Sequence, residues 1–252
     1  MEPSDLTGDP TVPTMPSSGP CERTGPSRSQ GRTPCRRQPE PVGATRRTLA
    51  EAASAAAGRD PVLGALVERH GTPPARPHVP AGLRFATLAR SILYQQLAGN
   101  AAAAIHGRFV TAVGGVVTPE AVLAASPEDL ATCGLSRAKA ASIRDLADKV
   151  SSGQVSLERI GRLGDEEVVE HLVQVRGIGR WTAEMFLIGT LGRLDVWPVG
   201  DYGVRAGYGQ GWGLPGIPTP AELTVLGERY RPYRSVVAWY CWRVVDDRTG
   251  GD

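Results

Sequence analysis

Helix-start signals recur along this sequence and limit the folds that are open to it. Each is a capping residue followed by proline, a pairing typical of the first turn of a helix. The four such pairs are Asp60-Pro61, Thr118-Pro119, Ser126-Pro127 and Thr219-Pro220. Apolar residues recur between them at helical spacing, and only residues 196–198 could be extended. The sequence therefore predicts an all-α chain of about ten short helices.

Residues 1–47 differ in composition from the rest. They hold nine prolines, five glycines and no aromatic residue, a composition that cannot bury enough apolar surface to offset the entropy of ordering. We therefore expect a disordered tail, which could be inert or could serve as an electrostatic arm for DNA. The tail carries seven arginines against five acidic residues, whereas residues 48–252 carry 21 basic and 21 acidic side chains. Since the net charge of +2 lies in the tail, bulk charge does not indicate a nucleic-acid-binding domain.

Cysteine and histidine are distributed in a way that argues against a metal centre. The cysteines share no C-x-x-C spacing and lie far apart, at Cys21, Cys35, Cys133 and Cys241. The histidines are equally scattered, at His70, His78, His106 and His171. We therefore expect free thiols, no metal bound by side chains and no iron–sulfur cluster. The sequence has no long apolar run and no apolar leader, so we expect no membrane partner and a cytoplasmic protein, associated with the nucleoid if the source is bacterial.

Residues 175–186, V-R-G-I-G-R-W-T-A-E-M-F, have the pattern of a tight turn between two helices. Gly177 and Gly179 permit backbone conformations and close approaches that a side chain would prevent. The helix that follows would present its first N–H groups near Gly179, where the helix dipole favours an anion. Such a turn can grip one phosphate without a charged side chain. An ordinary helix–helix corner would have the same glycines, so the turn alone leaves both interpretations open.

Four longer motifs stand in collinear order within residues 58–245. They are FATLARSILYQQLAGNAAAAIHGRF, GLSRAKAASIRDLA, LVQVRGIGRWTAEMFLIGTLGRLDVWPVGDYGVRAGY and PYRSVVAWYCWR. Together they resemble the HhH-GPD superfamily of DNA glycosylases, and within it the 3-methyladenine DNA glycosylase II branch. Some members of that branch carry an extra N-terminal α/β domain, and the resemblance here is to a compact, helical-only form.

This resemblance implies a glycosylase domain over residues 48–252, with two helical lobes around a cleft. One lobe would span about residues 88–198, with a helix–hairpin–helix motif at about 165–188. The other would join residues 48–87 to residues 199–252. The resemblance also implies a monomer that binds double-stranded DNA containing alkylated bases.

The resemblance assigns the chemistry to one aspartate. Asp201 matches the family's catalytic aspartate, although an aspartate between a glycine and a helix also has the position of an N-cap. Its carboxylate would stabilise the positive charge that builds on the sugar as the N-glycosidic bond breaks, and would help to orient water. How it divides these two roles stays open. Trp181 stands where bifunctional relatives place a Schiff-base lysine, and no lysine follows Lys149, which implies an enzyme without lyase activity.

Further positions match the family's contacts with the damaged base and with DNA. Aromatic faces attract a cationic base, and the expected base pocket comprises Trp181, Tyr202, Trp242 and Met185. A flipped nucleotide leaves a gap in the duplex, which would be filled by Gln96 with Leu97 beside it, although a glutamine here could equally be a surface residue. The expected phosphate contacts are Gly177, Gly179, Arg180 and Thr182. A monovalent cation could bind the backbone carbonyls of Val173, Val175 and Ile178.

The resulting prediction is a monofunctional DNA glycosylase that removes alkylated purines such as 3-methyladenine or 7-methylguanine and leaves an abasic site. A non-catalytic helix–hairpin–helix DNA-binding protein is the main alternative, but it would not require the aspartate and the aromatic residues around it. A glycosylase for other damaged bases, such as hypoxanthine or ethenoadenine, also remains open. The sequence does not rank these bases.

Overall fold

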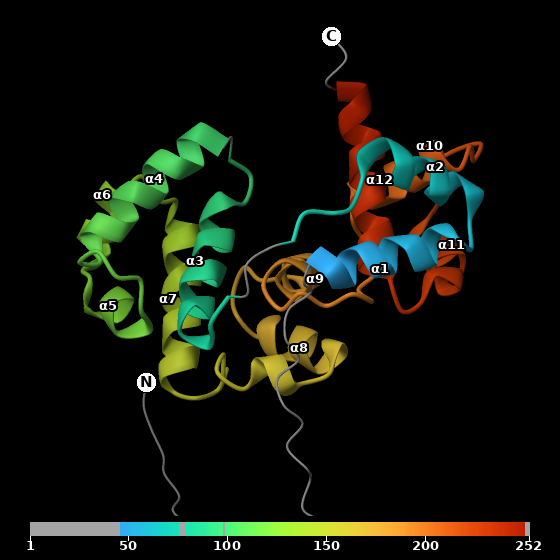
Figure 1. Cartoon of the computed structure of the whole chain (residues 1–252). Coiled ribbons are helices and arrows are strands. Elements are labelled where there is room, and N and C mark those ends of the chain that lie inside the picture. The colour runs from blue at the N-terminus through green and yellow to red at the C-terminus, as the bar shows by residue number, and fades with distance from the viewer. Residues whose placement is uncertain (1–45, 76–78, 98, 250–252) are drawn as a thin grey trace, which may run out of the picture. The chain divides into compact units, whose positions relative to one another are not determined.

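The chain is helical wherever its structure is described. The computed structural model describes residues 46–75, 79–97 and 99–249, in which twelve α-helices and three 3₁₀ helices occur and no strand does (Figure 1). The all-α prediction is confirmed, with more helices than the ten expected. Most of the predicted tail, together with Cys21, Cys35 and His78, lies outside the described residues. None of the described helices is long and apolar enough to cross a membrane.

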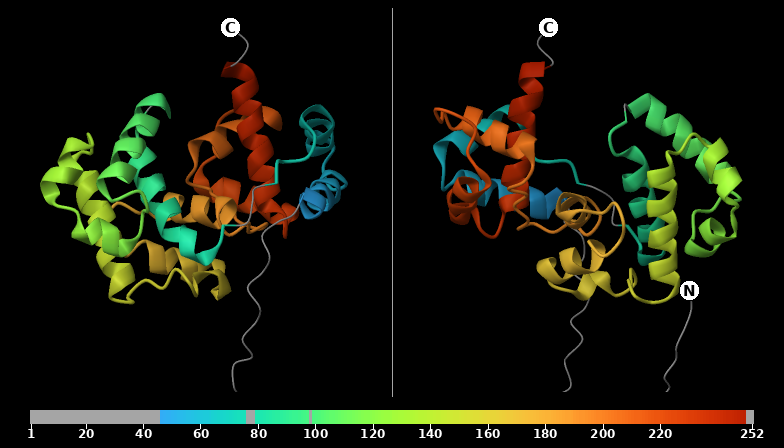
Figure 2. Two further views of the ribbon diagram at one scale, coloured as in Figure 1. Left: turned by 60° about the vertical axis from the view of Figure 1, so that its left-hand side comes forward. Right: turned by 180° about the vertical axis from the view of Figure 1, so that it is seen from behind.

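The helices between residues 84 and 189 share one hydrophobic core. They are α3 (Arg84–Tyr94), α4 (Gly99–Ala112), α5 (Pro119–Ala124), α6 (Pro127–Thr132), α7 (Arg137–Ser151), α8 (Asp165–Leu172) and α9 (Arg180–Gly189). Helices α3 and α5 both pack on α7, and α8 packs on α9 (Figures 1 and 2). Fully buried side chains such as Leu88, Ile143 and Leu172 form this core. The residues expected to enter DNA, at the end of α3, and the hairpin, α8–α9, therefore belong to one packed body.

The remaining α-helices share a second core. They are α1 (Arg46–Ala57), α2 (Pro61–His70), α10 (Tyr202–Gly211), α11 (Pro220–Gly227) and α12 (Arg234–Thr249). Helix α12 packs against α10, α2 and α1 (Figure 2), around buried residues that include Leu63, Val204 and Val237. The buried residues change from the first core to the second between Val196 and Trp197. Short 3₁₀ helices at Ala81–Leu83, Ile160–Arg162 and Glu228–Tyr230 complete the described elements.

The four cap-and-proline signals all begin helices. Asp60, Thr118, Ser126 and Thr219 are the N-caps of α2, α5, α6 and α11, and each side chain accepts a hydrogen bond from a backbone N–H of the first turn. Proline fits the first helical position because the N–H that it lacks has no partner there in any case. The helix boundaries that depend on these signals were therefore predictable from sequence.

Glycines spaced four residues apart let α10 approach α12 closely. A Cβ on Gly207 would overlap the backbone of Cys241, and a Cβ on Gly211 would come within 3.4 Å of Val244. Residues four apart lie on one face of a helix, so this face of α10 presents backbone alone to α12. The close approach brings the middle of α12 beside the first turn of α10, where Asp201 lies.

A buried carboxylate ties α2 to the C-terminal part of the chain. Asp60, 3% exposed, accepts hydrogen bonds at Oδ2 from the indole of Trp212 (2.8 Å) and the hydroxyl of Tyr230 (2.6 Å). Burial alone would raise the pKa of Asp60, but these bonds and those from the α2 amides outweigh it and hold the pKa below its ordinary value. The N-cap predicted from sequence thus also joins two distant segments.

Candidate active site

Asp201 is the N-cap of α10 and lies between two tryptophans. Its Oδ1 accepts hydrogen bonds from the backbone N–H of Val204 (2.7 Å) and the indole N–H of Trp242 (3.0 Å). Its Oδ2 accepts a hydrogen bond from the indole N–H of Trp181 at 2.6 Å. The side chain is 9% exposed. Three donors from three segments therefore fix the carboxylate in position, and capping a helix and holding a charge at a defined point are compatible roles.

The indole of Trp242 reaches Asp201 because residue 203 has no side chain. A Cβ on Gly203 would lie 3.0 Å from Cδ1 of Trp242 and 3.1 Å from Oδ1 of Asp201. These distances are shorter than ordinary van der Waals contact, so any larger residue would displace the indole or the carboxylate. Gly203 thus permits the contact between α10 and α12 on which the carboxylate depends.

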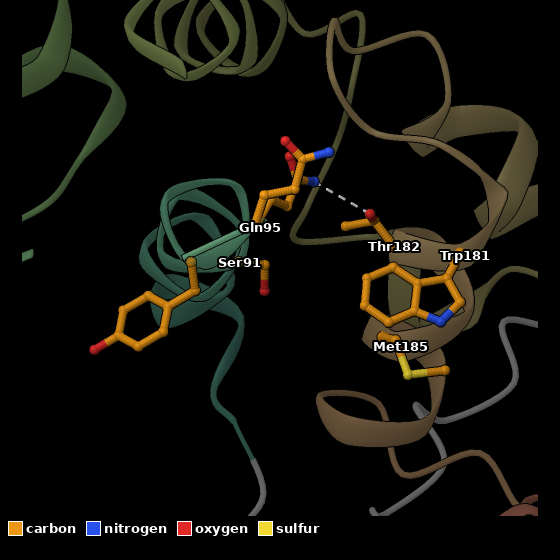
Figure 3. Close-up of a pocket in the computed structure, with 7 residues that line it drawn as sticks. Ser91, Gln95, Trp181, Thr182 and Met185 are labelled. Atoms are coloured by element: carbon orange, nitrogen blue, oxygen red, sulfur yellow. Dashed lines mark hydrogen bonds between the residues drawn. The ribbon is translucent and has the colours of Figure 1, made fainter. Parts of the chain in front are cut away.

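A pocket lies between α3 and α9, with Trp181 in its wall. Its volume is about 600 Å³, and its lining residues are Ser91, Tyr94, Gln95, Gln96, Trp181, Thr182 and Met185. Figure 3 shows Trp181, Thr182 and Met185 on α9 facing Ser91 on α3 and Gln95, the residue that follows α3. A volume of this order suits a small planar ligand. Since Trp181 both lines the pocket and donates to Asp201, the pocket and the carboxylate are directly linked.

Two of the four expected pocket residues line this pocket, and two lie around Asp201 instead. Trp181 and Met185 belong to the lining, whereas Tyr202 and Trp242 do not. Tyr202 is 68% exposed and follows Asp201 directly, at the start of α10. Trp242 donates its indole N–H to the carboxylate. Of the three expected aromatic residues, only Trp181 both lines the pocket and contacts Asp201.

The expected wedge residues lie at the end of α3, where the helix stops. Gln96 and Leu97 are both exposed, and Gln96 lines the pocket. Gln96 is the only non-glycine residue with a positive φ among the described residues, at 56°. An L-residue rarely adopts this conformation, so the chain reverses sharply at Gln96 and presents it at the rim of the pocket.

The two glycines of the hairpin turn differ in backbone conformation and in the space that a side chain would have. Gly177 has φ 79°, and a Cβ there would lie 2.5 Å from Oγ of Ser142 on α7. Gly179, the N-cap of α9, has an extended conformation that any residue adopts, and no atom lies within 4 Å of where its Cβ would be. No side chain caps α9 in the described structure. The first-turn amides of α9 therefore have no side-chain acceptor in the described structure, as is typical of a helix N-terminus that binds an anion.

The other two expected phosphate contacts are engaged within the protein. Arg180 forms ion pairs with Glu166 on α8 and with Glu184 one turn further along α9. Thr182 is buried, and its Oγ1 accepts a hydrogen bond from Nε2 of Gln95 at 3.3 Å. Among the described residues, the side chains of Arg180 and Thr182 therefore have partners within the protein, and the carbonyl of Gly177 accepts a hydrogen bond from Gln95. The turn is thus arranged to bind an anion through its backbone.

Glu184 is a buried acid that sequence reasoning did not single out. It is 6% exposed, and burial raises its pKa to about 7, although the guanidinium of Arg180 lies 3.7 Å away. Arg180 binds two acids at once: Glu166, which precedes the turn in sequence, and Glu184, which follows it. This arrangement braces α8 against α9, and the i, i+4 spacing of Arg180 and Glu184 was the signal that could have found it.

Three further residues that contact the candidate site also escaped the sequence reasoning. Gln95, Lys139 and Gly203 act on the site through hydrogen bonds or close packing. Lys139 lies in the quoted GLSRAKA motif without an assigned role, and the spacing Gly203-x₃-Gly207-x₃-Gly211 was readable as a close helix contact. For Gln95, no sequence signal distinguishes it from its neighbour Gln96.

Comparisons with known proteins agree with the family that the sequence motifs resemble. The model of the HhH-GPD superfamily of base excision DNA repair proteins matches residues 89–232. DNA-3-methyladenine glycosylase 1 of Schizosaccharomyces pombe is 39% identical over 162 residues, which cover 63% of this chain and 71% of that protein.

Solved structures show the same similarity. The structure of a Schizosaccharomyces pombe 3-methyladenine DNA glycosylase in complex with abasic DNA matches with a TM-score of 0.67 and 36% identity, over 77% of this chain and 95% of that one. A DNA-3-methyladenine glycosidase from Bacillus halodurans matches with a TM-score of 0.70 and 32% identity, over 79% of this chain and 91% of that one. The chain belongs to the HhH-GPD superfamily of base excision DNA repair proteins.

Proposed function

We propose that this protein is a monofunctional DNA glycosylase that hydrolyses the N-glycosidic bond of alkylated purines in double-stranded DNA and leaves an abasic site. The observation that carries the proposal is the carboxylate of Asp201, held by two indoles beside a pocket that one of them lines. The relatives named as 3-methyladenine glycosylases support the choice of substrate class.

Asp201 supplies the negative charge that the reaction needs. Positive charge builds on the deoxyribose as the base departs, and a fixed carboxylate stabilises that charge more than it stabilises the ground state. The indole N–H groups of Trp181 and Trp242 hold both carboxylate oxygens, so little reorganisation accompanies the reaction. The same carboxylate orients the water that attacks C1′.

Trp181 recognises the base. An alkylated purine such as 3-methyladenine carries a positive charge, and an indole face attracts cations. The N–H of Trp181 is directed at Asp201, so its ring remains available to stack in the pocket. Because Trp181 stands where related lyases have an amine, and no lysine follows Lys149, no imine can form with the sugar and the product strand stays uncleaved.

The hairpin and the end of α3 bind the DNA. The N–H groups at the start of α9, from Gly179 onward, donate hydrogen bonds to one phosphate near the lesion. Gln96 and Leu97 enter the duplex and fill the gap that the flipped nucleotide leaves. In this way the protein binds DNA as a monomer with little net charge in residues 48–252.

A monovalent cation is part of this proposal for the hairpin. The carbonyl groups of Val173, Val175 and Ile178 would hold it, and oxygen donors suit such an ion. The carbonyl of Val175 already accepts a hydrogen bond from the N–H of Ile178 (3.0 Å), which leaves its second lone pair for the ion. The ion would tighten the turn and add positive charge beside the phosphate.

The test is base release from a duplex that holds one alkylated purine. We expect the wild-type protein to yield free base and an intact strand that breaks only on alkaline treatment. Asp201→Asn should lower the rate about 100-fold or more, while its affinity for an abasic-site analogue stays close to that of the wild type. Strand cleavage without alkali would contradict the monofunctional assignment. Binding without base release, over a panel that includes hypoxanthine and ethenoadenine, would indicate a DNA-binding module.

A further inference from the structure

A lysine of α7 caps the last turn of α3. Nζ of Lys139 donates hydrogen bonds to the carbonyls of Leu93 and Gln95, both at 2.6 Å. The last carbonyls of a helix have no partner within the helix, and a cation is favourable at that end. Burial partly desolvates the ammonium group there, and this lowers the pKa of Lys139. Lys139 is one of only two lysines in the chain.

One of these two carbonyls controls the direction of the wedge. The Gln95 carbonyl belongs to the peptide unit that joins Gln95 to Gln96, and the φ angle of Gln96 is the rotation that follows that unit. Gln96 has a φ of 56°, a conformation that its surroundings must enforce. If the peptide plane before Gln96 is fixed, this φ sets the direction in which the Gln96 side chain points. The bond from Lys139 fixes that plane.

The side chain of Gln95 forms a second tether, to the hairpin. Its Nε2 donates to the carbonyl of Gly177 (3.1 Å) and to Oγ1 of Thr182 (3.3 Å). The segment before the wedge is therefore held on one side by α7 and on the other by the turn that would bind phosphate. The Lys139 tether involves no residue expected to touch DNA, whereas the Gln95 tether ends on two of the expected phosphate contacts, Gly177 and Thr182.

Helix α7 also holds the hairpin. Oγ of Ser142 occupies the space beside Gly177, and Oδ2 of Asp145 accepts the backbone N–H of Arg176 at 2.7 Å. Lys139, Ser142 and Asp145 are spaced three apart, so they follow one another along one side of α7. One helix side thus sets the positions of both segments expected to contact DNA.

We propose that Lys139 is a positioning residue for base flipping: by binding the Gln95 carbonyl it holds Gln96 and Leu97 in the orientation that enters the duplex. This inference rests on the proposed function but concerns a step before bond cleavage. Lys139 does not contact the base or the sugar. It acts through the backbone before Gln96, which makes its contribution specific to duplex DNA in which a base must be extruded.

The first test measures insertion without chemistry. The probe is a duplex with a tetrahydrofuran abasic-site analogue and a neighbouring 2-aminopurine, whose fluorescence changes when a side chain enters the stack. At saturating protein, the wild type should change the fluorescence, Lys139→Met should give a much smaller change, and Lys139→Arg should recover part of it. Arg144→Met is the matched control, because Arg144 also lies on α7 and donates to a carbonyl after a helix, that of Ala125 after α5 (2.9 Å), rather than to the end of α3. Equal amplitudes for wild type and Lys139→Met would overturn the proposal, as would no change with the wild type.

The second test separates insertion from catalysis. Single-turnover base release is compared between an alkylated purine paired normally and the same purine opposite an abasic analogue, where extrusion breaks no base pair. We expect Lys139→Met to be slower by about tenfold on the paired lesion, since charge-assisted hydrogen bonds are lost, and close to wild type on the unpaired one. Equal losses on both substrates would overturn the proposal in favour of a general structural role.

These two tests also distinguish failure of this inference from failure of the proposed function. If the wild type releases no base from either substrate, the glycosylase assignment fails, and the fluorescence amplitudes still decide the role of Lys139. Thermal unfolding shows whether Lys139→Met is folded. Should it not be, Lys139→Gln keeps an N–H donor and should give an intermediate amplitude; an amplitude equal to that of the wild type would then count against the proposal.

Discussion

Nε1 of Trp181 donates a hydrogen bond to Oδ2 of Asp201 at 2.6 Å, across 20 residues of sequence. The contact joins the first turn of α9, the second hairpin helix, to the N-cap of α10. Trp181 is half exposed, so this bond rather than packing fixes its ring. Base recognition and bond cleavage are therefore linked through one indole, and the two functions of Trp181 can be separated by substitution.

Trp181→Phe removes the N–H but keeps an aromatic face. We expect base release to slow by about tenfold, because the carboxylate loses one of its charge-assisted hydrogen bonds, while the KM for a cationic base changes little. Single-turnover rates over a range of DNA concentrations measure the two effects. Trp181→Ala removes both functions and should weaken binding of the lesion as well. A phenylalanine variant as slow as the alanine variant would show that the N–H, and not the ring face, carries the whole effect.

Gly203→Ala tests the contact between α10 and Trp242. The new Cβ would lie 3.0 Å from the indole of Trp242 and 3.1 Å from Oδ1 of Asp201, so the indole must move and the carboxylate loses a donor. We expect slower base release with affinity for abasic DNA maintained. Gly200→Ala is the control, since no atom lies within 4 Å of its Cβ position. If both variants have wild-type rates, Trp242 does not hold the carboxylate during the reaction.

The helix boundaries were largely predictable because they depend on local chemistry. A cap and a proline act within one turn, so the starts of α2, α5, α6 and α11 follow from neighbouring residues alone. Between Phe85 and Val110 the apolar spacing alone does not reveal that there are two helices, α3 and α4, because it continues on both sides of the break at Gln96. The turn there is imposed by contacts with α7, which lies more than 40 residues away in sequence.

The contacts within the candidate site could not be predicted from the sequence. Family motifs singled out Asp201 and Trp181, yet the hydrogen bond between them depends on how two helices meet. The same holds for Arg180: its position after the turn suggested a phosphate contact, whereas two acids bind its guanidinium. Glu166 lies on the preceding helix, and only the closed hairpin brings it within reach. Long-range pairing is the part that sequence patterns do not encode locally.

Glu184 makes stability depend on pH near neutrality. Burial raises its pKa to about 7 from an ordinary value of 4.5, so between these pH values the folded protein binds a proton that the unfolded chain has released. The free energy of unfolding should therefore fall as pH rises from about 4.5 to 7 and level off above, by up to about 3 kcal/mol.

Glu184→Gln should abolish this dependence and be the more stable protein at pH 8. Urea unfolding at several pH values measures it. Glu170→Gln is the control, because that acid is exposed on α8 and lies outside the Glu166–Arg180–Glu184 cluster. A wild type whose stability rises between pH 5 and 7 while that of Glu184→Gln does not would contradict the assignment.

The contribution of Asp60 to the free energy of unfolding should have the opposite pH dependence from that of Glu184. Its pKa is held below the ordinary value, so its contribution is present above the unfolded pKa of about 4 and is lost as pH falls through the lower folded pKa. Asp60→Asn keeps an oxygen for the N-cap of α2, but its NH₂ group cannot accept the bonds from Trp212 and Tyr230. We expect the free energy of unfolding of Asp60→Asn to be lower by about 2 kcal/mol at pH 7, and the difference to shrink in acid.

Tyr230→Phe removes one donor and leaves the carboxylate, so it should lower the free energy of unfolding by about half as much. Chemical denaturation at pH 7 and pH 3 compares the two variants. An Asp60→Asn protein as stable as the wild type at pH 7 would mean that these bonds contribute nothing net to folding.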